Sequence, residues 1–111
     1  MNRQTAFRVV LVTCATLEEA RTIAREVVEK HLAACVNILT HAVESFYPWE
    51  GKLENSSEYL LTIKTREDCL EGLQQEVLRL HSYDTPEFIV LPIVGGSEPY
   101  LKWLGESVGS K

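Results

Sequence analysis

The chain has 111 residues, which is the length of one domain, and 45% of them are hydrophobic and 24% charged, so disorder over most of its length is excluded. Its 16 acidic and 11 basic side chains give a net charge of −5, which argues against a nucleic-acid binder that relies on bulk positive charge. No apolar run approaches the roughly 18 residues that a membrane span needs. Three cysteines without a C-x-x-C pair favour reduced thiols in a cytoplasm.

The chain begins with the pattern of a strand followed by a helix. The segment Phe7–Cys14 is short, rich in valine and apolar at both parities, which predicts a strand buried on both faces. Thr16 and Glu19 then have the spacing of a capping box, in which a hydroxyl caps the helix and an acidic residue follows three positions later. Apolar residues at helical spacing come next, so the pattern predicts a helix over 17–31.

The next segment predicts a long hairpin. Residues 34–47 indicate a strand whose alternation is interrupted at 40–43, where we expect a bend or bulge. Residues 50–52 are typical of a turn, and 57–65 alternate regularly between apolar and polar side chains, as in a half-buried strand. An aromatic cluster at the far end of this hairpin favours an association surface, although the rings could instead close the local core: Phe46, Tyr47 and Trp49.

The remaining elements complete the fold class. The pattern predicts a second helix over 67–81, a strand over 88–94 and a short third helix over 97–108. The order is therefore that of an α+β, ferredoxin-like βαββαβ domain with an extra C-terminal helix. We expect a single domain over 7–109, with a flexible N-terminal tail over 1–6 and a flexible end over 110–111.

The predicted sheet has more apolar surface than two helices can cover. The first strand offers Val10 and Val12 to one face and Val9 and Leu11 to the other, and the last strand repeats this pattern. At about 25 cal/mol per Å² of apolar area, a second face left in water would forfeit many kcal/mol. We therefore expect self-association through the sheets, while folding of the third helix across the open face is the alternative.

The candidate metal ligands are the three cysteines and three histidines, Cys14, Cys35, Cys69, His31, His41 and His81. No two have zinc-finger or zincin spacing, and Cys35 and Cys69 lie in apolar or helical contexts typical of small buried side chains. His31 and His81 lie in the last turns of predicted helices, where an imidazolium complements the helix dipole. Cys14 and His81 end elements that can lie at opposite edges of the fold. A thiolate and an imidazole, if they meet, would suit copper or zinc.

The sequence offers no constellation for catalysis. A cysteine nucleophile needs a histidine base, and no spacing in the chain indicates that pair. Glu58, Glu87 and Lys64 could serve acid–base chemistry, but charges on strands of an oligomer more often form ion pairs at interfaces. We therefore expect a protein that is not an enzyme and has no catalytic residues.

Four stretches of the chain resemble the CutA family of divalent-cation tolerance proteins: LAACVNI at 32–38, YPWEGKLE at 47–54, HSYDTPE at 81–87 and YLKWL at 100–104. The resemblance covers about 7–108 with the family's order and spacing. It implies a cytoplasmic protein with a ferredoxin-like protomer in a tight homotrimer, built like the PII signalling proteins. It also implies a link to copper and other divalent cations.

The resemblance also suggests site residues. Some family members bind copper through a cysteine on the first strand and a His-His pair. In this chain His81 matches the second histidine, while Leu80 and Val12 occupy the other two ligand positions and Cys14 follows two residues after Val12. The resemblance thus implies a copper or similar divalent-cation site at His81 and Cys14, with no cofactor required. As an alternative, it implies a PII-like signalling or scaffold trimer that binds a small ligand or protein partner in clefts between subunits. The lining candidates are Glu58, Lys64, Tyr83, Glu87 and Trp103.

Overall fold

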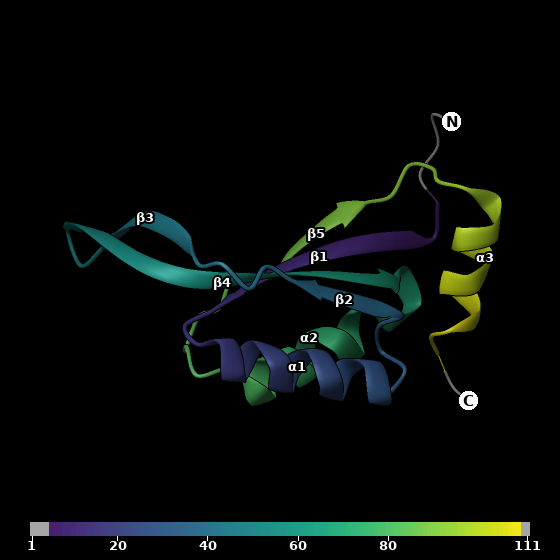
Figure 1. Ribbon diagram of the computed structural model, residues 1–111, viewed down its shortest axis with the longest axis horizontal. Coiled ribbons are helices and arrows are strands. Elements are labelled where there is room, and N and C mark those ends of the chain that lie inside the picture. The colour runs from purple at the N-terminus through teal and green to yellow at the C-terminus, as the bar shows by residue number, and fades with distance from the viewer. Residues whose placement is uncertain (1–4, 110–111) are drawn as a thin grey trace.

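Figure 1 shows an antiparallel sheet with two helices packed against one face and a third helix at the end opposite the hairpin. This computed structural model describes residues 5–109. The elements are β1 (Phe7–Cys14), α1 (Leu17–Glu29), β2 (Cys35–Ile38), β3 (Val43–Trp49), β4 (Lys52–Arg66), the 3-10 helix η1 (Glu67–Cys69), α2 (Leu70–Leu80), β5 (Ile89–Pro92) and α3 (Glu98–Glu106). The predicted α+β class is confirmed.

The strands lie in the order β2-β4-β1-β5, with every pairing antiparallel, and β3 pairs with the outer part of β4. The register places Val10 opposite Ile63 and Val12 opposite Leu61, so the core side chains of β1 and β4 share one face. This is the split βαβ arrangement that the order of the predicted elements indicates.

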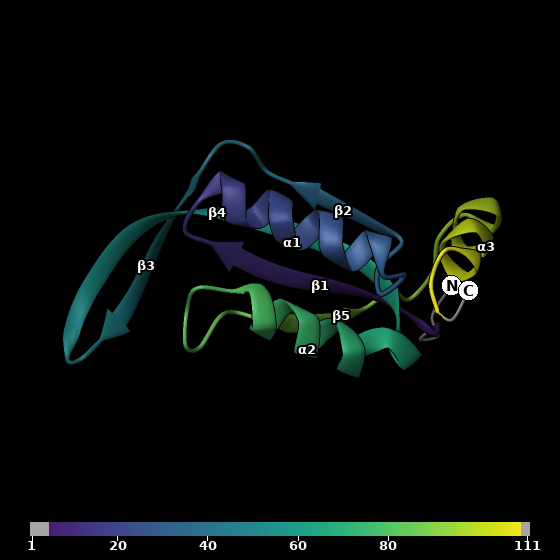
Figure 2. The same ribbon diagram turned by 90° about the horizontal axis from the view of Figure 1, so that it is seen from below.

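The hydrophobic core lies between that face and the helix pair. Figure 2 shows α1 and α2 side by side over the sheet. Ile23 and Val27 of α1 and Leu73 and Val77 of α2 are fully buried, as are the core residues of β1 and β4. Burying each of these side chains contributes about 1.5–3 kcal/mol relative to leaving it exposed.

The opposite face of the sheet stays largely uncovered in a single copy. Val9 and Leu11 of β1 pair with Leu91 and Ile89 of β5, and the two β5 residues are 42% and 45% exposed. The helix α3 packs at the end of the sheet through the fully buried Leu104, far from the hairpin (Figures 1 and 2). The alternative in which the third helix covers the open face is therefore wrong.

The hairpin formed by β3 and β4 projects from the body of the molecule, as Figure 1 shows at its left. Its two-residue turn has positive φ at both positions, 52° at Glu50 and 78° at Gly51, as the tight hairpin turns that match strand twist require. The predicted turn is confirmed, and so is the predicted interruption, because β2 ends at Ile38 and β3 begins at Val43. The aromatic cluster at the end of the hairpin is exposed.

Several predicted helix ends are wrong. The first helix ends at Glu29, and His31 has a φ of 60°; His31 N–H donates to Val28 and Leu32 N–H to Val27, which is a Schellman motif with histidine in place of the usual glycine. The second helix begins as η1 and ends at Leu80, so His81 has an extended backbone outside it. The interpretation of His31 and His81 as dipole partners within a last turn therefore fails.

The last two elements are also shorter than predicted, with β5 at Ile89–Pro92 and α3 at Glu98–Glu106. Of the predicted flexible ends, 1–4 and 110–111 lie outside the described residues. Thr5 and Ala6 are held in place, because Thr5 donates to the Ile93 carbonyl and the Ala6 carbonyl accepts from Glu67 N–H. Within the described part of the chain, the helices are too short or too polar to cross a membrane.

Candidate functional site

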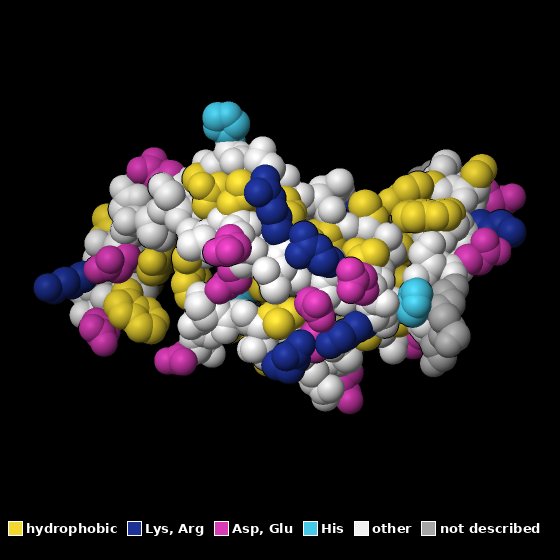
Figure 3. Space-filling view, turned by 60° about the horizontal axis from the view of Figure 1, so that its bottom comes forward, with side chains coloured by type: hydrophobic (Ala, Val, Ile, Leu, Met, Phe, Trp, Pro, Cys, Tyr) yellow, Lys and Arg dark blue, Asp and Glu magenta, His cyan; other side chains and the backbone are white. Residues whose placement is uncertain are grey.

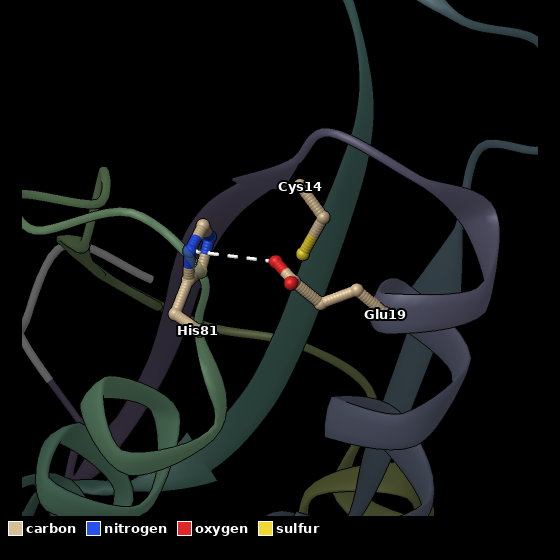
Figure 4. Close-up of side chains that lie close together, drawn as sticks. All are labelled: Cys14, Glu19 and His81. Atoms are coloured by element: carbon tan, nitrogen blue, oxygen red, sulfur yellow. Dashed lines mark ion pairs between the residues drawn. The ribbon is translucent and has the colours of Figure 1, made fainter.

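Three side chains from separate elements converge at the end of β1. Cys14 ends β1, Glu19 lies in the first turn of α1 and His81 follows α2, and their ligand atoms all lie within 4.8 Å of one another (Figure 4). The topology accounts for this meeting. Because β4 runs antiparallel to β1 and α2 folds back from it, α2 ends where β1 ends. The expectation that Cys14 and His81 could lie at opposite edges is wrong for this chain.

The His81 imidazole is fixed on both sides, and its side chain is fully buried. Its Nε2 lies 2.7 Å from the carbonyl oxygen of Thr13, and its Nδ1 lies 3.0 Å from the backbone nitrogen of Tyr83. A carbonyl only accepts and a backbone N–H only donates, so these partners assign the proton to Nε2 and leave a lone pair on Nδ1. The ring also contacts the Tyr83 ring, with 4.7 Å between the centroids.

Glu19 brings an unsatisfied oxygen to the same place. Its backbone N–H donates to the Thr16 hydroxyl, which is the half of the predicted capping box that forms. Its Oε2 is buried without a hydrogen-bond partner and lies 3.4 Å from Nδ1 of His81, as the dashed line in Figure 4 marks. A buried acceptor without a donor costs about 1–3 kcal/mol, so this oxygen needs a functional or structural explanation.

The Cys14 thiol is held in its protonated form. Burial, followed by the charge of the neighbouring Glu19 carboxylate and a hydrogen bond to it, raises the pKa of Cys14 to about 12. Such a thiol is a poor nucleophile. Sulfur, imidazole nitrogen and carboxylate oxygen together form a donor set that suits copper or zinc. The sequence does not indicate Glu19 as a candidate ligand, because the capping-box spacing already explains this residue.

A cleft of about 760 Å³ lies beside this cluster, between the hairpin and the segment that follows α2. It brings together three of the predicted lining residues, Glu58, Tyr83 and Glu87. The Tyr83 hydroxyl donates to Glu58 Oε2 at 3.0 Å; burial and then this hydrogen bond raise the pKa of Tyr83 to about 12. Burial, followed by the charge of Glu58, raises the pKa of Glu87.

The other two predicted lining residues lie elsewhere in this copy. Lys64 lies on the open face of the sheet, where its ammonium group donates to Asn37 and Thr62. Trp103 lies on α3, with its ring centroid 5.5 Å from that of Tyr100. Their place in a cleft between subunits stays a prediction.

The two family ligand positions that differ in this chain hold apolar packing residues. Val12 is fully buried in the core, and Leu80 is half-buried against it. Neither side chain offers a donor atom, so neither can ligate a metal ion in this chain.

Comparison with known proteins gives one consistent result. A family model described as the CutA1 divalent ion tolerance protein matches residues 8–107. A chloroplastic CutA protein of Arabidopsis thaliana is 50% identical over 99 residues, which is 89% of this chain. The chain spans only about half of that relative's length, 54%. A divalent-cation tolerance protein CutA of Thermus thermophilus is 45% identical over 101 residues, which is 91% of this chain and 97% of the relative.

Solved structures agree with the sequence matches. The Thermus thermophilus divalent cation tolerance protein superimposes with a TM-score of 0.90 at 44% identity, over 93% of this chain and 99% of that one. The CutA1 structure from Oryza sativa gives a TM-score of 0.92 at 44% identity, over 97% and 98% of the two chains. A similar protein of Archaeoglobus fulgidus is described as periplasmic, so the names of these relatives place them in different compartments.

Proposed function

This chain belongs to the CutA1 family of divalent ion tolerance proteins, and we propose on that premise that it is a homotrimeric divalent-cation tolerance protein that responds to metal ions. We propose further that Cys14, Glu19 and His81 bind copper or a similar divalent cation. The observation that carries the metal proposal is the buried Glu19 oxygen without a partner, beside a histidine nitrogen that bears a lone pair.

The residues of the cluster fit a cation in chemistry and in charge. A bound divalent cation would supply the positive charge that the Glu19 oxygen lacks. For binding, Cys14 must lose its thiol proton, and Nδ1 of His81 must give up the hydrogen bond from Tyr83 N–H. Both changes oppose binding, and the first makes the affinity fall as the pH falls. We therefore expect a weak site that releases protons when it is loaded.

The uncovered face of the sheet supports the homotrimer. Apolar residues of β1 and β5 lie side by side there, and α3 does not cover them. A second copy that packs on this face would remove its apolar area from water, at about 25 cal/mol per Å². The family resemblance supplies the number three. The three free cysteines support a reducing compartment, and we infer a cytoplasmic location from them.

Calorimetric titration of the metal-free protein with Cu(II), and with redox-inert Zn(II), tests the metal site. We expect His81→Ala and Glu19→Gln each to weaken binding at least about tenfold, which is the usual scale for the loss of a contact of this kind. His41→Ala is the matched control for His81→Ala, and Glu18→Gln is the matched control for Glu19→Gln, since each removes the same kind of group outside the cluster; both should leave the affinity unchanged. Equal binding by His81→Ala and the intact chain would remove His81 from the site.

The cleft favours a second candidate function, in which the trimer binds a small ligand as a signalling or scaffold protein without catalytic activity. Its volume of about 760 Å³ is in the range of ligand sites, and Tyr83 holds the Glu58 carboxylate at its wall. A thermal-shift screen with nucleotides, amines and small carboxylates tests this function. Stabilisation that is lost in Glu58→Gln supports it, and the absence of stabilisation by any of these compounds contradicts it.

A further inference from the structure

The walls of the cleft carry negative charge without a matching positive charge. Its lining includes the carboxylates of Glu54, Glu58, Asp84 and Glu87, and no lysine, arginine or histidine. Figure 3 shows a hollow between the hairpin, at the left, and the body, with acidic and hydrophobic side chains around it. Among residues 5–109, the ion pairs involve other carboxylates.

One of these carboxylates belongs to a residue that is almost fully buried. Glu58 is 7% exposed, and its Oε2 accepts the hydrogen bond from Tyr83. Among the described residues no hydrogen bond reaches its Oε1, and this oxygen is not among the buried atoms that lack a partner, so it stays accessible at the wall of the cleft. An accessible carboxylate oxygen in a cleft without basic lining residues can accept a hydrogen bond from a cationic ligand.

The remaining walls are aromatic. Tyr47 and Trp49 of the hairpin and Tyr83 of the opposite wall line the cleft, and Trp49 is 58% exposed. The faces of such rings attract ammonium groups, with about 0.5–2 kcal/mol for each contact. Carboxylates combined with aromatic faces therefore select a cation that has an apolar body.

The spacing of the carboxylates distinguishes an organic cation from a metal ion. Among the described residues, the one group of three metal-ligand side chains whose donor atoms approach within 4.8 Å is the Cys14 cluster. The cleft carboxylates are thus spread along the walls and do not converge on one point. A hard divalent cation needs several oxygens at about 2.0–2.6 Å, whereas a linear amine can place separate ammonium groups beside separate carboxylates.

We infer that the cleft binds a linear aliphatic amine with two or more ammonium groups, held by Glu58, Glu87 and the other cleft carboxylates and by the faces of Tyr47 and Trp49. This inference rests on the second candidate function and names its ligand class, and it uses none of the three proposed metal ligands. A basic side chain of another copy would compete for the same place.

Tryptophan fluorescence gives a local readout, because the chain has two tryptophans and only Trp49 lines the cleft. In the intact chain, we expect spermidine to cause a saturable change in emission that Trp49→Phe abolishes, and triethylene glycol of similar length to cause none. Glu58→Gln and Glu87→Gln should each weaken the spermidine affinity about tenfold. Glu71→Gln, an exposed acidic position on α2 outside the cleft, should change it less than about twofold.

Three outcomes overturn the inference. If Glu58→Gln and Glu71→Gln weaken the spermidine affinity equally, the net charge of the protein alone attracts spermidine. The same emission change with Mg²⁺ would show that any dication suffices. If ATP changes the emission and spermidine does not, the ligand is not a cation, although the second candidate function, binding of a small ligand in the cleft, is still supported. Calorimetry of Glu58→Gln with Cu(II) is the last arm. Because the charge of Glu58 is a lesser cause of the raised pKa of Cys14, copper binding should be retained or slightly tighter in this variant, whatever the amine result.

Discussion

Replacement of Glu19 by glutamine should make the metal-free protein more stable while it weakens the metal site. The Glu19 Oε2 is buried without a donor and faces the lone pair of His81 Nδ1 at 3.4 Å. A glutamine of the same shape removes the charge, and its amide can donate toward Nδ1 or the Cys14 sulfur. An unsatisfied buried group costs about 1–3 kcal/mol, and the side chain keeps 17% exposure, so we take the lower end, about 1 kcal/mol. This corresponds to a rise in Tm of roughly 4 °C.

The assay is thermal unfolding by circular dichroism in buffer with a chelator. Glu18→Gln is the matched control, because Glu18 lies in the same first turn of α1 and is exposed. The Glu18→Gln variant loses the same favourable charge at the N-terminus of α1 but leaves Cys14, Glu19 and His81 unchanged, so its Tm should be slightly lower. A Glu19→Gln protein that melts below Glu18→Gln and still binds Cu(II) normally would refute the reasoning, since the carboxylate would then serve stability alone.

Three further predictions concern the rest of the fold. His31→Gly should raise stability by about 1 kcal/mol in thermal unfolding, because histidine occupies a left-handed position that glycine adopts without strain; a lower Tm would contradict this. Hydrogen bonds from Arg79 and then Lys30 lower the pKa of Glu76 from 4.5 to about 2. The ionised Glu76 carboxylate therefore stabilises the folded state above pH 4.5, and this stabilisation is lost as the pH falls toward 2. Glu76→Gln should therefore lower Tm at pH 7 and flatten the loss of stability between pH 5 and 2, and a pH profile parallel to that of the intact chain would argue against it. Leu91→Lys should convert the proposed trimer to smaller species in sedimentation equilibrium, because it places a charge on the uncovered face; an unchanged mass would mean that the copies pack elsewhere.

The sequence predicts elements best where burial imposes a period on the side chains. The predicted bounds of the strand β1 match the observed ones, because apolar side chains occupy both of its faces from Val9 to Val12. The strand β4 begins at Lys52, five residues before the predicted start at Ser57. Its outer part pairs only with β3 and is mostly exposed, so hydrogen bonds to β3 define it and no hydrophobic period marks it.

Helix ends and the candidate site depend on contacts that a linear pattern does not contain. Nothing in the residue type of His31 indicates a left-handed conformation, since glycine usually occupies that position. Cys14 and His81 were identified as candidates separately, and their meeting follows from the direction of α2 relative to β1. Glu19 was identified only as a helix cap. Its second role lies in where the carboxylate points, which depends on the packing of α1 against the end of α2.

Crystals of the intact protein grown with Cu(II) give the most direct test of the metal site, through anomalous difference maps measured on both sides of the copper absorption edge. We predict a copper peak that contacts the Cys14 sulfur, the Glu19 carboxylate and a ring nitrogen of His81. Copper found only at the exposed His41, or only along the hairpin, would contradict it.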